Sequence, residues 1–365
     1  MKVPHNITVL LLLKDRSNFT QRWLEVHNDL GFSLPIHIAD GSLTYQNSNI
    51  IHKFLNSKPV LNIDYKFYGK DINLEKFYQK IYEAVRCIST DYVILADNDD
   101  FLIEESIMKG AENFRNNEDL IAVSGPAYDT TICNTKPEHD QTWGVLSNPI
   151  NQYPASDRVE NNALSRLQSF LVNRKSSYVW SAIHKRKIFL ETCKDILKIN
   201  PIDFRFLTHS IILFTLARGK VSGSSPCMTI HQDNPGESAG KKLAQIGTWH
   251  DWIQTDNWFS SYKKMILKLT DIILENENHK REELKRNIEF MYQGLIGELI
   301  LRITHPYYLH NIYKKGETIN KSDPIFNTFI KIKTYISNKE FKKKERFQRN
   351  KTRRMLSKLL RAFKN

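Results

Sequence analysis

The chain has 365 residues, of which 41% are hydrophobic and 11% aromatic, so it can bury a substantial core and lacks the composition of a disordered protein. Its net charge of +13 is unevenly spread: residues 339–365 carry 12 Lys or Arg against two Glu, which leaves only about +3 on the other 338 residues. A basic balance confined to one short segment does not indicate a nucleic-acid-binding body, and the four cysteines form no CxxC or CxxH pair typical of structural zinc.

The first 130 residues alternate between short apolar runs and amphipathic stretches. The run over 7–13 predicts a buried strand, because it is too short to span a membrane and strands of parallel sheets are apolar on both faces. Further strands are predicted over 35–39, 60–68, 91–96 and 120–124, and helices over 18–30, 47–55, 74–88 and 104–115. This order predicts an α/β fold with a mostly parallel sheet covered by helices on both faces, in which ligands bind beyond the carboxyl ends of the strands.

The pattern is less regular after residue 130. Residues 134–154 are rich in Pro, Asn, Asp and Gln and predict a loop, as do residues 232–240. Helices are predicted over 161–171 and 206–217, and a strand over 177–183. Two long helical patterns over 258–275 and 281–304 predict a mainly helical C-terminal region.

An acidic turn, Asp97-Asn98-Asp99-Asp100, follows the fourth predicted strand directly. Three carboxylates this close repel one another, and a divalent cation such as Mg²⁺ or Mn²⁺ would remove that repulsion while binding a diphosphate. The simpler alternative is a solvated turn in which Asp99 or Asp100 caps the next helix. A second acidic turn begins at Asp40, after the second predicted strand, which favours the cation site.

Three segments resemble conserved blocks of the family-2 glycosyltransferases, in the order of that family. They are VLLLLKDR at 9–16, ADGS at 39–42 and YVILADNDDF at 92–101, and they are most similar to a bacterial subgroup with ADGS and DNDDF motifs. The resemblance covers residues 5–130 well and 155–235 loosely. It implies a GT-A fold and transfer of a monosaccharide from a nucleoside-diphosphate sugar, with UDP as the expected leaving group and Mg²⁺ or Mn²⁺ as the cation. The expected acceptor is a hydroxyl of a glycan or lipid-linked glycan, the expected outcome is inversion, and the expected pathway is surface polysaccharide synthesis.

The resemblance also implies roles for individual residues. Asp40 would contact the base or ribose, and the alternative for this residue is an Asx turn before Gly41. Asp97 would lie near the ribose and the cation, Asp99 would bind the cation, and Asp100 would serve the acceptor side. The expected basic contacts to the nucleotide are Lys80, Lys14 and Arg16, where the alternative for Lys80 is a solvated helix lysine.

An inverting transferase needs a general base that takes the proton of the acceptor hydroxyl. The resemblance places this group near the start of the helix predicted over 206–217, where the subgroup has Glu but this chain has Thr208 and His209. The candidates are Asp203, whose alternative role is a helix cap, and His209, whose alternative is a surface histidine. Asp100 and Asp157 remain further possibilities.

Three other side chains are weaker candidates for the same site. His231 would be a cation or diphosphate contact, unless it is an ordinary loop histidine. Trp143 and Trp180 could stack on a sugar ring, although core packing explains Trp180 more simply.

The resemblance implies a nucleotide-sugar-binding half over 1–130 and an acceptor-binding half over 131–235. The helical pattern and the charge distribution then mark a helical region over 236–338 and a basic tail over 339–365. In the tail, apolar residues recur at helical spacing, which favours a helix on an anionic membrane surface over docking to a partner or a solvated tail. The absence of a visible secretory signal or membrane span, together with unpaired cysteines, favours a cytoplasmic protein held at the inner face of the membrane.

Two other functions remain open at this stage. A sugar nucleotidyltransferase shares a related sheet, but it places a glycine-rich loop after the first strand, where this chain has residues 14–18 without glycine. A non-catalytic adaptor that binds membranes or polyanions through the tail would not bind nucleotides.

Overall fold

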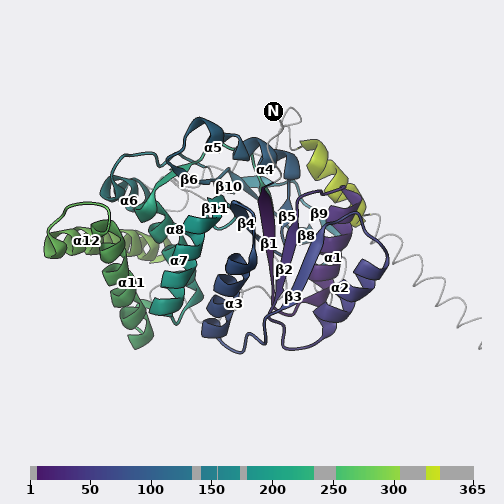
Figure 1. Cartoon of the computed structure of the whole chain (residues 1–365), viewed down its shortest axis with the longest axis horizontal. Coiled ribbons are helices and arrows are strands. Elements are labelled where there is room, and N and C mark those ends of the chain that lie inside the picture. The colour runs from purple at the N-terminus through teal and green to yellow at the C-terminus, as the bar shows by residue number, and fades with distance from the viewer. Residues whose placement is uncertain are drawn as a thin grey trace, which may run out of the picture.

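The computed structural model describes residues 6–133, 141–153, 155–172, 179–233, 252–304 and 326–337. A large mixed sheet forms the centre of the molecule (Figure 1). In spatial order its strands are β12 (Lys220–Ser222), β6 (Leu120–Val123), β11 (Ile183–Lys185), β4 (Tyr92–Asp97), β1 (Ile7–Leu13), β2 (Ile36–Asp40) and β3 (Ile63–Phe67). Only β11 runs antiparallel to its neighbours within this sheet, so the mostly parallel α/β fold predicted from the sequence is confirmed.

Helices cover both faces of the large sheet. One face carries α1 (Ser17–Asp29), α2 (Gln46–Asn56), α4 (Glu104–Ala111) and α5 (Asn113–Asn116). The other carries α3 (Leu74–Cys87), α6 (Ala163–Leu171), α7 (Arg186–Ile199) and α8 (Phe204–Arg218), and α11 (Asp256–Leu274) and α12 (Arg281–Thr304) extend that layer. The two helices that the sequence predicted over 258–275 and 281–304 therefore pack into the same core as the second helix layer.

The two cores follow from the alternation of side chains along the central strand β1. Val9, Leu11 and Leu13 belong to the core under α1 and α2, whereas Leu10 and Leu12 belong to the core under α3 and α7. All five are buried, and burial of each side chain contributes about 1.5–3 kcal/mol to folding. All residues of this strand except Thr8 are apolar, because both faces of the strand are covered.

A second, smaller sheet lies beside the carboxyl end of β4. Its order is β10 (Ile150–Tyr153), β7 (Ala127–Thr130), β13 (Thr229–Gln232) and β5 (Phe101–Leu102), and a hairpin of β8 (Ile132–Cys133) and β9 (Val145–Leu146) adjoins it. The loop predicted over 134–154 is therefore wrong in part: residues 141–144 and 147–149 are irregular, but β9 and β10 form by pairing with earlier segments of the chain. The strand predicted over 177–183 is also largely wrong, since the described residues 179–182 form a turn and β11 begins at Ile183.

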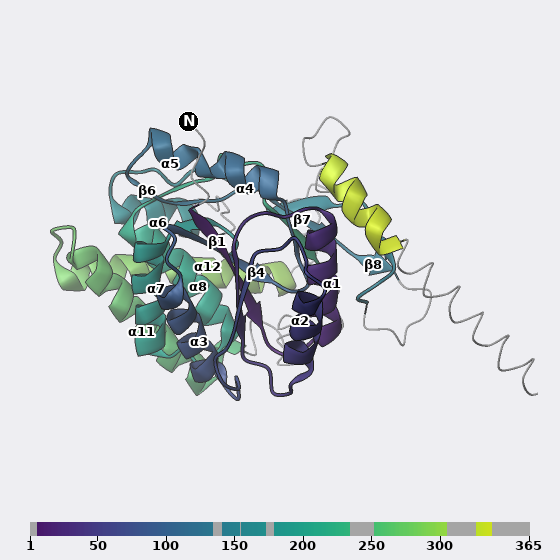
Figure 2. The same ribbon diagram turned by 45° about the vertical axis from the view of Figure 1, so that its right-hand side comes forward.

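A helix over residues 326–337 returns to the smaller sheet and α1 (Figure 2). Phe329, Ile332 and Ile336 are buried in a third apolar cluster with residues of β5, β7, β13 and α1. Within the described part of the chain, no helix combines the length and apolar character needed to cross a membrane. The basic tail over 339–365 lies outside the described residues.

Candidate functional site

The two acidic turns lie on either side of β1, at the carboxyl ends of the parallel strands β2 and β4 of the large sheet. In the parallel register Leu13 pairs with Asp40 of β2, and Leu12 pairs with Asp97 of β4. The chain runs from β1 to β2 and β3 on one side and then crosses back to β4 on the other. Open α/β sheets bind ligands at such a reversal of strand order, so the acidic turns occupy the expected place for a ligand.

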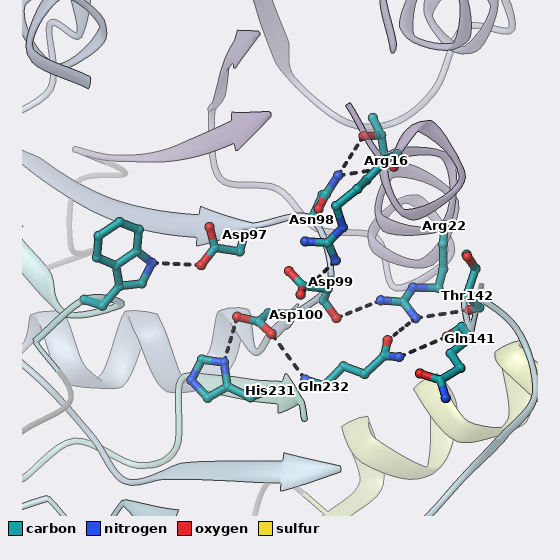
Figure 3. Close-up of polar contacts among 12 residues, drawn as sticks. Arg16, Arg22, Asp97, Asn98, Asp99, Asp100, Gln141, Thr142, His231 and Gln232 are labelled. Atoms are coloured by element: carbon teal, nitrogen blue, oxygen red, sulfur yellow. Dashed lines mark hydrogen bonds and ion pairs between the residues drawn. The ribbon is translucent and has the colours of Figure 1, made fainter. Parts of the chain in front are cut away.

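Contacts from α1 and the loop before it hold the 97–100 turn (Figure 3). The Arg16 guanidinium forms an ion pair with Asp99, with 2.8 Å between Nη2 and Oδ2. The Asn98 side chain donates to Thr20 Oγ1 over 3.0 Å. From deeper in the core, Arg22 donates to the Asp99 carbonyl over 2.7 Å. The turn is thus fixed by three side chains of α1 and its N-terminal loop, rather than acting as a cap for the next helix.

Asp97 lies where negative charge is least compensated. Its Oδ2 accepts a hydrogen bond from Trp180 Nε1 over 2.9 Å. Burial, together with the neighbouring carboxylates of Asp100 and Asp99, raises the pKa of Asp97 from 3.8 to about 7. A carboxyl that resists ionisation in this way marks a place where a cation would bind favourably.

Asp100 faces His231 from the smaller sheet. The antiparallel register of β13 with β5 pairs Ile230 with Phe101, which brings the next residue of β13 beside the preceding residue of the turn. Asp100 Oδ2 lies 2.7 Å from His231 Nδ1, and Asp100 Oδ1 accepts from the Gln232 amide over 3.2 Å. Burial alone would lower the pKa of His231, but Asp100 and further carboxylates raise it to about 9. The histidine therefore acts as a cationic partner of Asp100 in this structure.

Asp40 is buried and has its own local partners. Its Oδ1 accepts from the Ser42 amide over 2.9 Å, which is the Asx turn considered as the simpler alternative, and its Oδ2 accepts from Tyr65 over 3.0 Å. The Asx turn does not prevent Asp40 from also contacting a ligand, because a carboxylate can accept more hydrogen bonds than these two.

Lys80 points into the protein rather than along the surface. Its Nζ donates to the Leu13 carbonyl over 2.7 Å and forms a buried ion pair with Asp71. Burial lowers the pKa of Lys80 and raises that of Asp71, while each charge opposes the other shift. The alternative of a solvated lysine is wrong, and Lys80 instead stabilises the carboxyl end of β1 through its hydrogen bond to the Leu13 carbonyl. Lys14 is exposed at the same edge.

The three candidates for a general base outside the turn lie in different surroundings. Asp203 is the N-cap of α8 and accepts from the Arg205 amide over 2.7 Å, as the simpler alternative proposed. Burial raises the pKa of Asp203. The next residue, Phe204, packs on Trp180 with ring centroids 6.0 Å apart, so the start of α8 adjoins the indole that contacts Asp97.

His209 and Asp157 lie away from this contact. His209 Nδ1 is 2.7 Å from the Tyr292 hydroxyl, in the interface between α8 and α12, and burial lowers the pKa of His209 to about 4. Asp157 accepts from the Gly223 amide over 2.8 Å beside the edge strand β12. Trp143 packs near Tyr335 of the 326–337 helix, with ring centroids 6.4 Å apart.

The donor set suits a hard divalent cation only in part. Among the described residues, no three His, Cys, Asp or Glu side chains form a ready cation site. Mg²⁺ and Mn²⁺ often bind through one or two carboxylates and complete their coordination with substrate phosphates and water. The partly buried Asp97 and the nearby Asp99 fit that mode once Asp99 exchanges its Arg16 partner for the cation.

Several residues of the site were missed from the sequence, among them Arg22, Asp71 and Gln232. Arg22 left a signal, because it occupies a core-facing position of α1 between Phe19 and Trp23, where an apolar residue is expected. Asp71 and Gln232 left none, since each lies in a polar stretch and acquires its partner only through the fold.

No protein-family model and no curated protein sequence matches this chain. Among solved structures, residues 1–349 of S. aureus TarS are 10% identical with a TM-score of 0.42, over 87% of this chain and 98% of that one. A complex of the same protein with UDP-GlcNAc gives 10% and 0.41. The mannosyltransferase PcManGT from Pyrobaculum calidifontis, in complex with GDP-Man and Mn²⁺, is 9% identical with a TM-score of 0.41, over 91% of this chain and 84% of that one. Similarity at this level assigns no function, so the function is argued from the residues of the site.

Proposed function

We propose that this chain is a metal-dependent glycosyltransferase that moves a monosaccharide from a nucleoside-diphosphate sugar to a hydroxyl of a glycan or lipid-linked glycan. UDP is the proposed leaving group, and inversion is the proposed stereochemical outcome. The observation that carries the proposal is the pair of acidic turns that flank β1 at the reversal of strand order. Of the three sequence blocks that resemble family-2 glycosyltransferases, two include those turns and the third covers most of β1 and the loop after it.

The donor is proposed to lie across the carboxyl end of β1. Asp40 is assigned to the base or ribose, and Asp97 and Asp99 are assigned to a Mg²⁺ or Mn²⁺ ion that carries the diphosphate. When bound, the cation supplies positive charge that stabilises the leaving diphosphate. Arg16 and Lys14, which lie on the loop at this edge, are assigned to the phosphates. Lys80 is assigned an indirect role, because its ammonium group is buried against Leu13 and Asp71.

In the proposed reaction the acceptor oxygen attacks the anomeric carbon as the bond to the diphosphate breaks, and a base removes the proton of the acceptor hydroxyl. We assign this base to Asp203. Its burial raises its pKa, which makes the carboxylate a better proton acceptor, and Phe204 ties the start of α8 to the Trp180–Asp97 contact. His209 suits the role less well, because its ring contacts Tyr292 between two helices. Asp100 is paired with His231, and this pair is assigned to the acceptor-side wall.

The acceptor is proposed to be presented at a membrane. Residues 339–365 combine 12 Lys or Arg with apolar residues at helical spacing, and each such cation contributes about 1 kcal/mol at an anionic surface. A lipid-linked acceptor would meet the enzyme at that surface, which favours a cytoplasmic protein bound to the inner face of the membrane and engaged in surface polysaccharide synthesis.

The direct test is calorimetric titration of UDP, GDP and other nucleoside diphosphates, with Mn²⁺ or with EDTA. We expect one nucleotide to bind in a metal-dependent manner, and Asp99→Asn to abolish that binding. The matched control is Asp119→Asn, because Asp119 is an exposed carboxylate that pairs with Lys220 at the opposite edge of the sheet. A folded wild-type protein that binds no nucleotide would contradict the proposal.

A further inference from the structure

Arg22 is a buried arginine at the back of the acidic turn. It lies on α1 with 0% of its surface exposed. Its guanidinium lies over the rings of Phe19 and Phe101, at 4.9 and 4.8 Å from their centroids. Burying a guanidinium is costly unless its hydrogens find acceptors, so the contacts of this side chain explain why it is tolerated.

The acceptors of Arg22 come from three segments that are distant in sequence (Figure 3). Nη2 donates to the Asp99 carbonyl over 2.7 Å, within the acidic turn. Nη1 donates to the Thr142 carbonyl over 3.0 Å and to Gln232 Oε1 over 2.6 Å. Two of these partners lie 120 and 210 residues from Arg22 along the chain.

Gln232 extends the network in two directions. Its side-chain amide donates to the Gln141 carbonyl over 2.9 Å, and its backbone amide donates to the Asp100 carboxylate over 3.2 Å. The acidic turn, the end of β13 and residues 141–142 are therefore joined through one guanidinium and one amide. Residues 141–142 shortly precede β9, and Gln232 is the last residue of β13, so the network ties the turn to the smaller sheet and to the segment before β9.

Only arginine suits this arrangement. A guanidinium presents five donors in a rigid plane, so it can bond to acceptors on different sides, whereas lysine carries three donors on one atom. Apolar packing alone would be served by leucine or methionine at this position, because the neighbouring core positions of α1 are Phe19, Trp23 and Val26. The network, rather than the core, therefore accounts for the arginine.

We propose that Arg22 is a positioning residue that fixes the acidic turn relative to residues 141–142 and the end of β13. It acts through the Asp99 carbonyl and through Gln232, and it has no direct role toward the donor. This inference rests on the proposed function in one respect, namely that the position of the turn controls metal-dependent nucleotide binding. The structural link between the acidic turn, residues 141–142 and the end of β13 does not depend on that function.

The test compares Arg22→Met with Arg166→Met in the full chain. Arg166 is the matched control, because it is also a buried arginine whose donors bond to backbone carbonyls, including that of Leu216 over 2.7 Å, but it lies on α6 away from the turn. Gln232→Met removes the second arm of the network and serves if Arg22→Met does not fold. The readouts are hydrogen exchange of the peptides that cover 97–102 and 141–149, and calorimetric titration of nucleotide with Mn²⁺.

We expect Arg22→Met to accelerate exchange in both peptides and to weaken nucleotide binding about tenfold, because buried hydrogen bonds to a charged group are lost. Arg166→Met should lower stability without either effect, and Gln232→Met should give the Arg22→Met pattern in a weaker form. A folded Arg22→Met protein with wild-type exchange in both peptides would overturn the proposal, as would Gln232→Met with wild-type exchange if Arg22→Met does not fold. A wild-type protein that binds no nucleotide would instead sink the proposed function, and hydrogen exchange alone would then decide the role of Arg22.

Discussion

At the scale of single residues, the loop after β1 holds an arginine in a strained conformation against the acidic turn. Asp15 and Arg16 both have φ of 58°, in the left-handed region that is unfavourable for residues other than glycine. The Asp15 amide donates to Ser42 Oγ over 2.9 Å, and its carboxylate accepts from the Leu43 amide over 2.9 Å. These bonds to the other acidic turn fix the loop, and Arg16 is thereby held against Asp99 as a substitute for a cation.

This arrangement predicts an unusual effect of Arg16→Gln. If the guanidinium competes with a cation for Asp99, its removal should tighten the binding of Mn²⁺ alone, by about fivefold for an ion pair worth about 1 kcal/mol. The same change should weaken nucleotide binding with Mn²⁺, because the phosphate contact proposed for Arg16 is lost. Lys14→Gln removes the same charge from the same loop and should leave the affinity for Mn²⁺ alone nearly unchanged. Calorimetry on the three proteins checks this, and an Arg16→Gln protein with weaker Mn²⁺ binding would contradict it.

The buried Lys80–Asp71 pair predicts that replacement of Gly41 by alanine lowers the stability of the protein. The Cβ of an alanine at position 41 would overlap the Asp71 carboxylate, so Gly41→Ala must displace that group from Lys80. Breaking a buried ion pair costs about 3–5 kcal/mol of unfolding free energy. Gly297→Ala in α12 is the control, because nothing lies within 4 Å of its added Cβ, and it should leave stability unchanged or slightly higher. Urea unfolding measures both, and equal stability of the two variants would refute the steric argument.

The acidic turn was predictable because its signal is local. An apolar strand that runs into Asp97 and a second acidic turn at Asp40 can both be read along the chain. The roles of Lys80 and Arg22 were not predictable, since a lysine in the stripe of α3 and an arginine in that of α1 acquire meaning only from acceptors supplied by other elements. The Asx turn expected as the alternative role of Asp40 is present in the structure. The same carboxylate therefore forms a local turn and remains a candidate for ligand binding.

At the scale of elements, His27 connects α1 to β5 and can do so only when neutral. Its Nδ1 lies 2.8 Å from the Trp23 carbonyl, so it must donate, while Nε2 accepts from the Leu102 amide over 3.1 Å. A proton on Nε2 would point at the Leu102 amide hydrogen and remove this hydrogen bond, so the ring must be neutral. Burial, the largest cause, lowers the pKa of His27 from 6.5 to about 4. The unfolded chain therefore takes up a proton between pH 6.5 and 4 that the folded chain does not, and the stability from this histidine is lost as the pH falls through that window.

His27→Gln should reduce this loss. Between pH 6.5 and 4 the wild-type protein should lose up to about 1.4 kcal/mol per pH unit more than the variant, which corresponds to one proton. His52→Gln, a change at an exposed histidine of α2, should keep the wild-type slope. Urea unfolding at several pH values gives the slopes, and taking the difference removes the contributions of other buried groups. Identical slopes for wild type and His27→Gln would show that His27 is protonated in the folded protein.

The elements also show where sequence patterns succeed and fail. Most strands and helices of the first 130 residues were predicted, because each of these is long or strongly periodic. The short strands β5 and β7 were not predicted, and the helix predicted over 104–115 divides into α4 and α5. β11 has three residues and joins β4 to β6 in the middle of the sheet, so tertiary pairing and not its own pattern forms it. α7 was missed despite apolar residues at Phe189, Cys193 and Ile196, spaced as on one helix face.

At the scale of the whole molecule, the 326–337 helix connects the end of the chain to the wall of the candidate site. Phe329, Ile332 and Ile336 pack into the cluster that includes residues of α1, β5 and β13, and Tyr335 donates to Glu25 over 3.4 Å. The basic segment over 339–365 follows almost directly. The point from which it leaves the described structure is therefore fixed close to the smaller sheet, on which the acceptor side of the site is proposed.

Truncation before or after this helix should separate the contribution of the helix to stability from the contribution of the basic tail to membrane binding. Removal of 326–365 exposes a cluster that three apolar side chains cover, and at about 1.5–3 kcal/mol for each it should lower stability by several kcal/mol. Removal of 339–365 alone should leave the midpoint of urea unfolding within error of the wild-type value. If both truncations unfold at the same urea concentration as the full chain, the helix does not contribute to the core.

The shorter truncation also tests the proposed membrane contact. The removed segment carries a net charge of +10 and places Met355, Leu356, Leu359, Leu360 and Phe363 at helical spacing. A helix of this kind binds anionic surfaces through both charge and apolar area, so the full chain should sediment with vesicles that contain phosphatidylglycerol, less at high salt and little with phosphatidylcholine alone. The protein without 339–365 should remain in the supernatant yet bind nucleotide as the full chain does. Equal sedimentation of both proteins would place the membrane contact elsewhere on the molecule, and binding of neither would favour a protein partner for the tail.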